Sequence, residues 1–252
     1  MPIQRECTIM RAEKLNPFAW SLTLDAGELA RAALPGQFIH VKCGDSRLLR
    51  RPISICDTDG NCLRMVFEVR GEGTAWLSRR HTDETLDVLG PLGHGFDLSG
   101  RKLLAVGGGI GVPPILNVVR HCKGEAHAIL GFRSVDRAML LDEFRAASST
   151  VSVASDDGSI GTHGFVDALV REKLKGERDV AGVLACGPRP MLRAVAKAAA
   201  EAGVPCQVSM EERMGCGVGA CLVCACKMAD GAYRHVCKDG PVFRAEEVDW
   251  DE

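Results

Sequence analysis

Hydrophobic and polar residues alternate in short runs over the first hundred positions of the chain. A period of two, interrupted by glycine, proline and aspartate, is typical of half-buried β-strands. The pattern predicts strands at residues 7–11, 20–24, 37–41, 53–56, 63–69 and 85–89, and one helix at 74–80. Because short strands lose their exposed edges when the sheet closes, we expect an antiparallel β-barrel, closed or partly closed, over residues 1–99.

A different pattern begins after residue 100, where short apolar runs alternate with stretches of helical periodicity. It predicts strands at 103–106, 126–130, 151–154, 183–185 and 207–210, and helices at 112–121, 140–146, 165–173 and 190–202. Continuous apolar strands that alternate with helices indicate a parallel sheet covered on both faces. We therefore expect an α/β domain over residues 100–208.

Four late cysteines, Cys216, Cys221, Cys224 and Cys237, carry the clearest chemical signal. They follow a C-x4-C-x2-C spacing and then, after twelve residues, a last cysteine. Three glycines and an alanine within residues 215–220 allow close backbone approach and positive φ angles. This spacing is that of a plant-type [2Fe–2S] site. The sequence thus predicts a small C-terminal [2Fe–2S] module over residues 209–252, and a chain that moves electrons singly.

Two alternatives remain open for these cysteines. Four thiolates also suit a structural zinc ion, although zinc ribbons usually present two C-x2-C pairs and only one is present here. Cys226 lies two residues after Cys224 and could replace it as a ligand. If a strand begins here, both side chains lie on one face, so that one binds and the other packs as a small apolar residue.

A glycine-rich turn follows the predicted strand at 103–106. It contains Gly108, Gly109, Ile110 and Gly111, and two prolines open the next helix. Glycines let the backbone approach a diphosphate, and a helix N-terminus offers free N–H groups. The pattern is not the G-x-G-x-x-G of a typical dinucleotide site, so a merely tight turn is the alternative. Cys186, at the end of another strand, could line a nicotinamide pocket or could be a core thiol.

A second anion site is predicted near Gly73 and Thr74. These residues follow Gly71, and Thr74 could cap the helix through its hydroxyl. Arg51 lies about twenty residues earlier and could neutralise a phosphate, while Ser54 offers a hydroxyl to a heterocycle. Two diphosphate sites in two domains would suit one flavin and one nicotinamide nucleotide.

The bulk composition narrows the choice of partners. The chain has 252 residues, of which 46% are apolar and 25% charged, enough for real cores. A net charge of −2 disfavours nucleic acid, and no apolar stretch is long enough to span a membrane. Twelve cysteines without the apolar segment of a secretion signal indicate a reducing compartment, so we expect a cytoplasmic protein.

These motifs together resemble the ferredoxin–NADP reductase superfamily across essentially the whole chain. Within it, the C-terminal module looks like the electron-transfer subunit of type B dihydroorotate dehydrogenase, on the strength of residues 216–221 and 236–243. The resemblance implies FAD, one [2Fe–2S] cluster and NAD, with an FMN-containing dihydroorotate dehydrogenase catalytic subunit as partner. It also implies a heterotetramer with two subunits of each kind, acting in pyrimidine (UMP) biosynthesis. Electrons would pass from the partner through the cluster and FAD to NAD+.

The resemblance also assigns roles to individual residues. Residues of two strands and of the turn at 71–74 would hold FAD: Arg51, Pro52, Ile53, Ser54, Val66, Phe67, Glu68, Gly73 and Thr74. Residues of the glycine-rich turn would hold NAD: Gly108, Gly109, Ile110 and Gly111. The four cysteines 216, 221, 224 and 237 would ligate iron. Glu68 departs from the pattern, because a basic or neutral residue is expected there. Arg133 leaves the choice between NAD and NADP open.

Two competing functions are consistent with the same residues. A related reductase subunit could serve an NAD(P)H–ferredoxin oxidoreductase, a sulfide dehydrogenase or a hydrogenase. The segment Lys-Asp-Gly-Pro-Val-Phe at 238–243 favours the dihydroorotate assignment. A regulatory subunit with a zinc knuckle and a degenerate nucleotide fold would instead be colourless.

Overall fold

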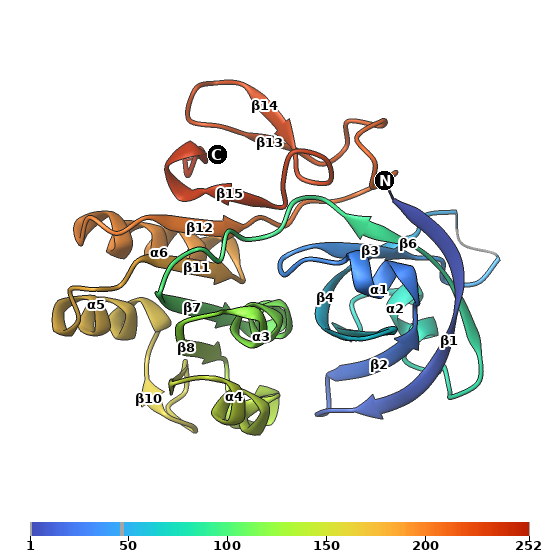
Figure 1. Ribbon diagram of the computed structural model, residues 1–252, viewed down its shortest axis with the longest axis horizontal. Helices are drawn as coiled ribbons and strands as arrows, with labels where there is room; N and C mark the ends of the chain where they lie inside the picture. Colours follow the sequence, from blue (N-terminus) through green and yellow to red (C-terminus); the bar gives the residue numbers. More distant parts are fainter. Residues whose placement is uncertain (1, 46–47, 252) are drawn as a thin grey trace.

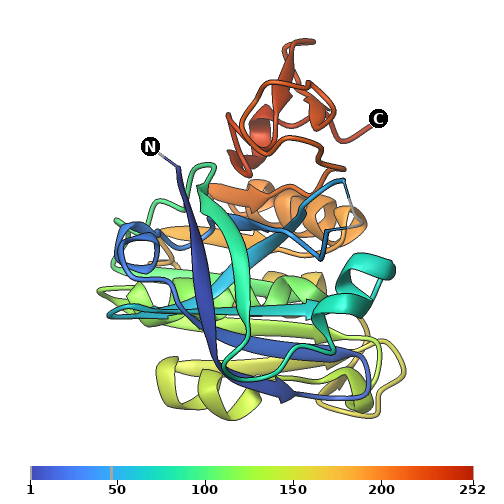
Figure 2. The same cartoon turned by 90° about the vertical axis from the view of Figure 1, so that its right-hand side faces the viewer.

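The computed structural model describes residues 2–45 and 48–251, and everything stated below concerns those residues. Figure 1 shows a β-barrel beside an α/β sheet, with the C-terminal segment lying across one end of both. In Figure 2 the same segment lies at the top of the molecule, above the barrel and the helices of the sheet. The predicted combination of an antiparallel barrel, a parallel α/β domain and a small C-terminal module is confirmed.

The barrel closes through antiparallel pairing in the order β1-β2-β5-β4-β3-β6. Its strands are β1 (Ile3–Lys14), β2 (Ala19–Asp25), β3 (Phe38–Val41), β4 (Arg51–Asp59), β5 (Cys62–Glu68) and β6 (Thr85–Leu92). Alternate apolar side chains such as Ile39, Ile55 and Met65 fill its interior, as the period of two predicted. The neighbouring residues on these strands point outward, and they carry the candidate site.

Two short helices accompany the barrel, and the sequence located them poorly. The helix predicted at 74–80 is α2 (Glu72–Leu77), which begins two residues earlier than expected. Thr74 occupies its third position, and the Thr74 hydroxyl accepts the N–H of Gly71 at 3.3 Å. Thr74 therefore caps the helix through its hydroxyl, as predicted, but it does so from the third helical position and not from the N-cap position. Helix α1 (Glu28–Ala32) was not predicted, since one turn of helix leaves no readable period.

The second sheet has the order β10-β9-β8-β7-β11-β12-β15, with helices on both faces. Its parallel strands are β7 (Lys102–Gly108), β8 (Glu125–Phe132), β9 (Thr150–Ser155), β10 (Thr162–His163), β11 (Gly182–Cys186) and β12 (Cys206–Ser209). The helices are α3 (Val112–His121), α4 (Leu141–Ala147), α5 (Val166–Gly176) and α6 (Arg189–Glu201), with short 3-10 turns η1 (Gly109–Gly111) and η2 (Val135–Arg137). Helix α3 begins and ends where predicted.

Helix α3 joins the barrel to the sheet. Its buried residues, including Val112 and Ile115, share one apolar cluster with Ala19, Cys56 and Val66 of the barrel. The outward faces of β4 and β5 therefore meet the helix that follows the glycine-rich turn. This packing brings the predicted flavin strands and the predicted nucleotide turn to the same side of the molecule.

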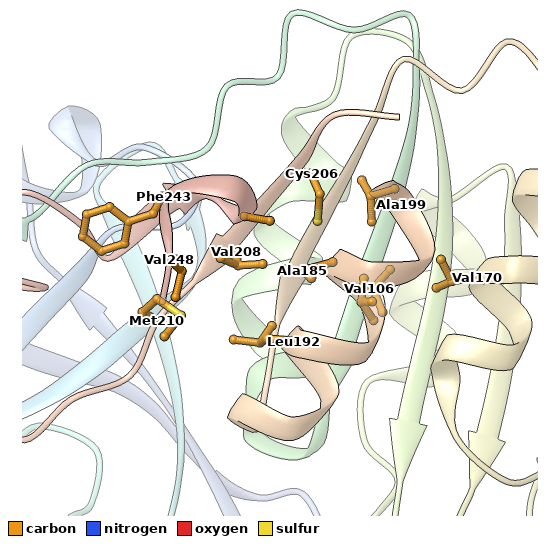
Figure 3. Packing of buried hydrophobic residues seen from close by; sticks show 14 of the residues in the cluster. Val106, Val170, Ala185, Leu192, Ala199, Cys206, Val208, Met210, Phe243 and Val248 are labelled. Carbon is orange, nitrogen blue, oxygen red and sulfur yellow. The ribbon is translucent and has the colours of Figure 1, made fainter. Parts of the chain in front are cut away.

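The C-terminal segment is tied to both layers. It contains β13 (Ala225–Lys227), β14 (Tyr233–His235), β15 (Val242–Arg244) and η3 (Ala245–Glu247). Strand β15 pairs antiparallel with β12, so the sheet gains an antiparallel edge, and Phe243 and Val248 pack near Val208 and Met210 (Figure 3). On the barrel side, the N–H of His94 donates to the carbonyl of residue 240 at 2.6 Å. No helix in the described part of the chain is long and apolar enough to cross a membrane.

Candidate functional site: a cysteine loop between two glycine turns

The loop between β12 and β13 turns tightly around its cysteines. Gly217 and Gly219 have φ angles of 74° and 80°, and Leu222 has a φ of 61°. Glycine adopts this left-handed region readily, whereas for a residue with a side chain this conformation is unfavourable in free energy. The prediction that the glycines serve positive φ angles is confirmed for Gly217 and Gly219. Their turns bring backbone N–H groups to the inside of the loop.

These N–H groups point at the cysteine sulfurs. The Cys216 sulfur accepts the N–H groups of Val218, Ala220 and Cys221 at 3.4, 3.2 and 3.4 Å. The Cys221 sulfur accepts the N–H of Cys216 at 3.3 Å. N–H groups at such distances stabilise negative charge on sulfur.

The two later sulfurs are served in the same way. The Cys237 sulfur accepts the N–H of Gly219 at 3.2 Å, and the Cys224 sulfur accepts the N–H of Cys237 at 3.4 Å. The first of these bonds joins residues 18 positions apart and closes the loop over the last cysteine. Each of the four sulfurs therefore accepts at least one backbone N–H, although Cys237 lies beyond β14 and the other three lie in the loop between β12 and β13.

The surroundings shift the pKa values of Cys216 and Cys237 in opposite directions. Burial acts to raise the pKa of Cys216, but the N–H groups of Val218, Cys221 and Ala220 outweigh it and lower the pKa to about 6. Burial raises the pKa of Cys237 to about 12, and the neighbouring Cys224 thiol adds to the rise. Metal ligation requires the thiolate form, which these environments favour at Cys216 and disfavour at Cys237.

The four sulfurs associate in pairs, Cys216 with Cys221 and Cys224 with Cys237. Within residues 2–45 and 48–251, no three or more His, Cys, Asp or Glu side chains converge on one point suited to a single metal ion. Two pairs of thiols fit a [2Fe–2S] cluster, which divides four thiolates between two irons. The donor set and the inward N–H groups therefore suit the predicted cluster.

Cys226 is placed differently from Cys224. It lies within β13 with 2% of its surface exposed, and its thiol is 3.8 Å from the carbonyl oxygen of Lys227. Cys224 precedes the strand and contacts Cys237 instead. The spacing argument for Cys224 as the ligand thus agrees with the geometry of the loop.

Arg51 and Gly73 lie against each other, as the second anion site requires. A Cβ on Gly73 would lie 2.9 Å from the guanidinium carbon of Arg51, so a side chain at this position would displace the arginine. Gly73 is buried, and Thr74 beside it also accepts the N–H of Arg70 at 2.9 Å. Arg51 begins β4 and Gly73 lies in α2, so the tertiary fold joins two motifs that the sequence separates by more than twenty residues.

The other predicted flavin residues divide between the two faces of the barrel wall. Ile53 and Phe67 belong to the barrel core, whereas Val66 faces helix α3. Pro52 and Ser54 are half-buried on the outward face of β4. Only the outward residues can offer side chains to a cofactor, so Ile53 and Phe67 could contribute only through the backbone.

Glu68 is a buried carboxylate paired with two arginines. Its oxygens lie 2.6 Å from Arg70 and 3.6 Å from Arg137, and 8% of the residue is exposed. Arg137 in turn lies over the ring of Phe18, 3.6 Å from its centroid. The negative charge is therefore neutralised within the chain. Arg137 was not predicted as a partner of Glu68, because the two residues meet only across the barrel–sheet boundary.

The glycine-rich turn packs against the end of β11. A Cβ on Gly111 would lie 2.5 Å from the carbonyl carbon of Cys186 and 2.6 Å from the nitrogen of Gly187. Gly108 is similarly close to Met191, 3.3 Å from its methyl carbon. Gly109 differs, since its φ is 53° and a Cβ there would meet nothing within 4 Å. Gly108 and Gly111 are therefore packed tightly against the protein, whereas the space beside Gly109 is free of protein atoms.

Cys186 ends β11 beside this turn. It pairs in register with residue 107 of β7, and 9% of its surface is exposed. Burial raises the pKa of its thiol to about 12, against an opposing contribution from Ser209. A thiol of this kind is a packing or lining group at neutral pH and is not a nucleophile.

His40 lies against Gly217 of the cysteine loop, a contact that the sequence did not reveal. It is fully buried on β3, and burial, followed by the charge of Arg50, lowers the pKa of its ring to about 4. Neither ring nitrogen has a hydrogen-bond partner. In the sequence, His40 is a single histidine within an apolar strand. Such a residue is often an ordinary part of a hydrophobic core, so the sequence offered no reason to select it.

Two known domain families match separate parts of this chain, the α/β sheet and the C-terminal segment. Residues 105–197 match the model of the oxidoreductase NAD-binding domain, and residues 211–249 match that of the iron–sulfur cluster binding domain of dihydroorotate dehydrogenase B. The electron transfer subunit of dihydroorotate dehydrogenase B (NAD(+)) from Bacillus caldolyticus is 44% identical over 91% of this chain and 92% of its own length. The corresponding subunit from Caldanaerobacter subterraneus subsp. tengcongensis is 41% identical over 85% and 86%.

A solved structure is also similar over most of both chains. It is that of an NADH-dependent reduced ferredoxin-NADP oxidoreductase studied for flavin-based electron bifurcation, with a TM-score of 0.86 and 33% identity. The match covers 97% of this chain and 90% of that chain. The barrel, the α/β sheet and the C-terminal segment thus occur together in a protein of known structure.

Proposed function

This chain belongs to the family of electron transfer subunits of dihydroorotate dehydrogenase B, and from that membership we propose that it carries electrons from a dihydroorotate-oxidising catalytic subunit to NAD+. The observation that carries the proposal is the set of backbone N–H groups aimed at the sulfurs of Cys216, Cys221, Cys224 and Cys237. When bound, a [2Fe–2S] cluster exchanges single electrons, and FAD exchanges either single electrons or the hydride that NAD+ accepts.

The chain's own residues bind and orient these groups. Cys216, Cys221, Cys224 and Cys237 would hold the cluster, and the loop N–H groups stabilise the negative charge on their sulfurs. Arg51 would neutralise the FAD diphosphate, which Gly73 allows to approach. The turn at Gly108–Gly111 would take the NAD diphosphate, with Cys186 lining the nicotinamide side of the pocket.

The partner surface is proposed to include the outer side of the cysteine loop. Val218, Leu222 and Val223 have 48%, 61% and 56% of their surfaces exposed, beside the exposed Cys221. Apolar side chains grouped on a surface mark an interaction site more often than scattered ones do. An FMN-containing catalytic subunit docked here would meet the edge of the cluster. Two copies of each subunit would give the heterotetramer that the family resemblance implies.

Co-purification with the catalytic subunit tests the function. The complex should contain iron, sulfide and flavin, and should form NADH when dihydroorotate is added. The chain alone should reduce a dye with NADH and should not respond to dihydroorotate. A chain that retains no flavin, or a complex that never couples dihydroorotate oxidation to NADH formation, would show the proposal to be wrong.

A pair of variants tests the partner surface. Leu222→Glu should weaken association with the catalytic subunit at least tenfold, because a charge replaces an apolar contact, while the iron content stays normal. Phe165→Glu is the control, since Phe165 is 69% exposed at the start of α5, far from the loop (Figure 1). Equal affinities of the two variants, measured by sedimentation or interferometry, would remove the cysteine loop from the interface.

One specific observation supports a second function. The structural similarity to the NADH-dependent reduced ferredoxin-NADP oxidoreductase extends over nearly the whole chain. The same cofactor set could therefore serve a ferredoxin-linked complex. The electron donor decides between the two: NAD+ reduction with dihydroorotate and the catalytic subunit supports the first function, and reduction with reduced ferredoxin alone supports the second.

A further inference from the structure

His40 lies on the wall between the barrel and the cysteine loop. Its strand neighbours Ile39 and Val41 belong to the barrel core, so His40 lies on the outward face with Phe38, whose ring centroid is 5.8 Å away. Phe38 shares an apolar cluster with Cys224 and other residues of the C-terminal segment. The outward face of β3 is therefore the surface on which the cysteine loop rests.

The His40 ring packs with its face against this loop, at Gly217. The Cε1, Nδ1 and Nε2 atoms lie 2.7, 2.8 and 2.9 Å from the position that a Cβ of Gly217 would occupy. Gly217 also has a φ of 74°, so both its backbone conformation and the ring exclude a side chain there. Gly217 directly follows Cys216. The imidazole ring is thus packed against the residue that follows a cysteine of the cluster site.

The ring has hydrogen-bonding capacity that the described chain does not use. Both nitrogens are buried and neither has a partner. Leaving a buried polar group unpaired costs about 1–3 kcal/mol, so a ligand that supplies the missing partner would explain why a histidine is present. On the other side, His40 pairs in register with Pro52 of β4, within the segment proposed to hold FAD. The strand that carries His40 is therefore paired with the strand proposed to hold FAD.

We propose that His40 donates its ring N–H to a sulfur of the [2Fe–2S] cluster and thereby raises the reduction potential of the cluster. The inference rests on the proposed function, because it requires that the cysteine loop holds the cluster. A hydrogen bond to a cluster sulfur favours the reduced state, which carries the additional negative charge. His40 acts as a positioning and tuning residue, since it ligates no iron and reacts with no substrate.

The experiment uses the complete protein with its cofactors, labelled with ¹⁵N-histidine. Pulsed EPR of the reduced cluster should detect a ¹⁵N coupling in the unsubstituted protein and in His81→Phe, where an exposed histidine is replaced. His40→Phe should lose this coupling and lower the reduction equilibrium constant of the cluster about tenfold, which is 59 mV for one electron. His40→Gln keeps an N–H donor and should retain a potential closer to that of the unsubstituted protein.

The possible outcomes distinguish a failure of the His40 proposal from a failure of the proposed electron-transfer function. A protein without any [2Fe–2S] EPR signal contradicts the proposed function. A normal cluster signal without histidine coupling, or an unchanged potential in His40→Phe, overturns the role of His40 alone. If His40→Phe fails to assemble the cluster, the coupling in the unsubstituted protein and the potential of His40→Gln decide. A shift confined to the flavin potential also counts against a bond to the cluster.

Discussion

Replacing Gly109 with alanine isolates the nucleotide role of the glycine-rich turn. Gly109 has a φ of 53°, and a Cβ at this position would meet no protein atom within 4 Å. Gly203, which follows α6, has a φ of 68° and equally open surroundings. Gly109→Ala and Gly203→Ala therefore impose the same kind of backbone strain without a steric clash. The two sites differ in that only Gly109 belongs to the proposed nucleotide turn.

The expected magnitudes separate stability from binding. An alanine in the left-handed region costs about 1–2 kcal/mol, so both variants should lose that much free energy of unfolding in urea. At Gly109 the added methyl group would occupy the space through which a diphosphate approaches the turn. Overpacking of one to a few methyl groups costs about 1–3 kcal/mol, which corresponds to a loss of NADH affinity of roughly tenfold to a hundredfold.

The assay measures NADH binding by fluorescence titration and flavin reduction by stopped-flow absorbance, alongside urea unfolding of each variant. Gly203→Ala should bind NADH with unchanged affinity despite its lower stability. Equal NADH affinities in the two variants would refute the assignment of Gly109 to the nucleotide site. A large difference in unfolding free energy would refute the assumption that their strain is the same.

Three further comparisons follow from the contacts of the site. Cys224→Ser should lose most of the bound iron and its visible absorbance, whereas Cys226→Ser should retain both, because the Cys224 sulfur accepts the N–H of Cys237 while Cys226 lies within β13; equal iron contents would contradict this. Arg51→Gln should release FAD at least tenfold more readily on dilution, while Arg50→Gln should keep FAD and lose stability, since Arg50 is held by Asp87 at 2.6 Å; the reverse result would reassign the phosphate contact. Gly111→Ala should lower the free energy of unfolding by about 1–3 kcal/mol or more through its clash with the end of β11, and an unchanged urea midpoint would show that the strand end yields freely.

Local patterns predicted the long elements well. Helix α3 has the predicted bounds, and each predicted barrel strand exists within a few residues of its expected position. These segments have strong periodicity and clear breaking residues at their ends. Helix α1, strand β10 and the strands after residue 224 were missed, because segments of two to five residues carry too few positions to show a period.

The arrangement of the elements in space was harder to predict from the sequence. The last strand, β15, returns to the α/β sheet and runs antiparallel to β12, although the sequence suggested a separate C-terminal module. The acidic segment that follows β15 is docked against the sheet through Val248, which is 3% exposed. Both results depend on apolar surface left uncovered at the edge of the sheet, which no local pattern reports.

By itself, the sequence determined the chemistry of this protein. The spacing of four cysteines, the glycines among them and the two glycine-rich turns each specify what a short backbone segment can bind, because loop geometry depends on near neighbours in the chain. Only the tertiary structure decided which of these segments meet: Arg51 with Gly73, Gly111 with Cys186, and His40 with Gly217. Such contacts arise when distant apolar faces pack together, and the packing brings a buried imidazole to the cysteine loop from a strand more than 170 residues earlier.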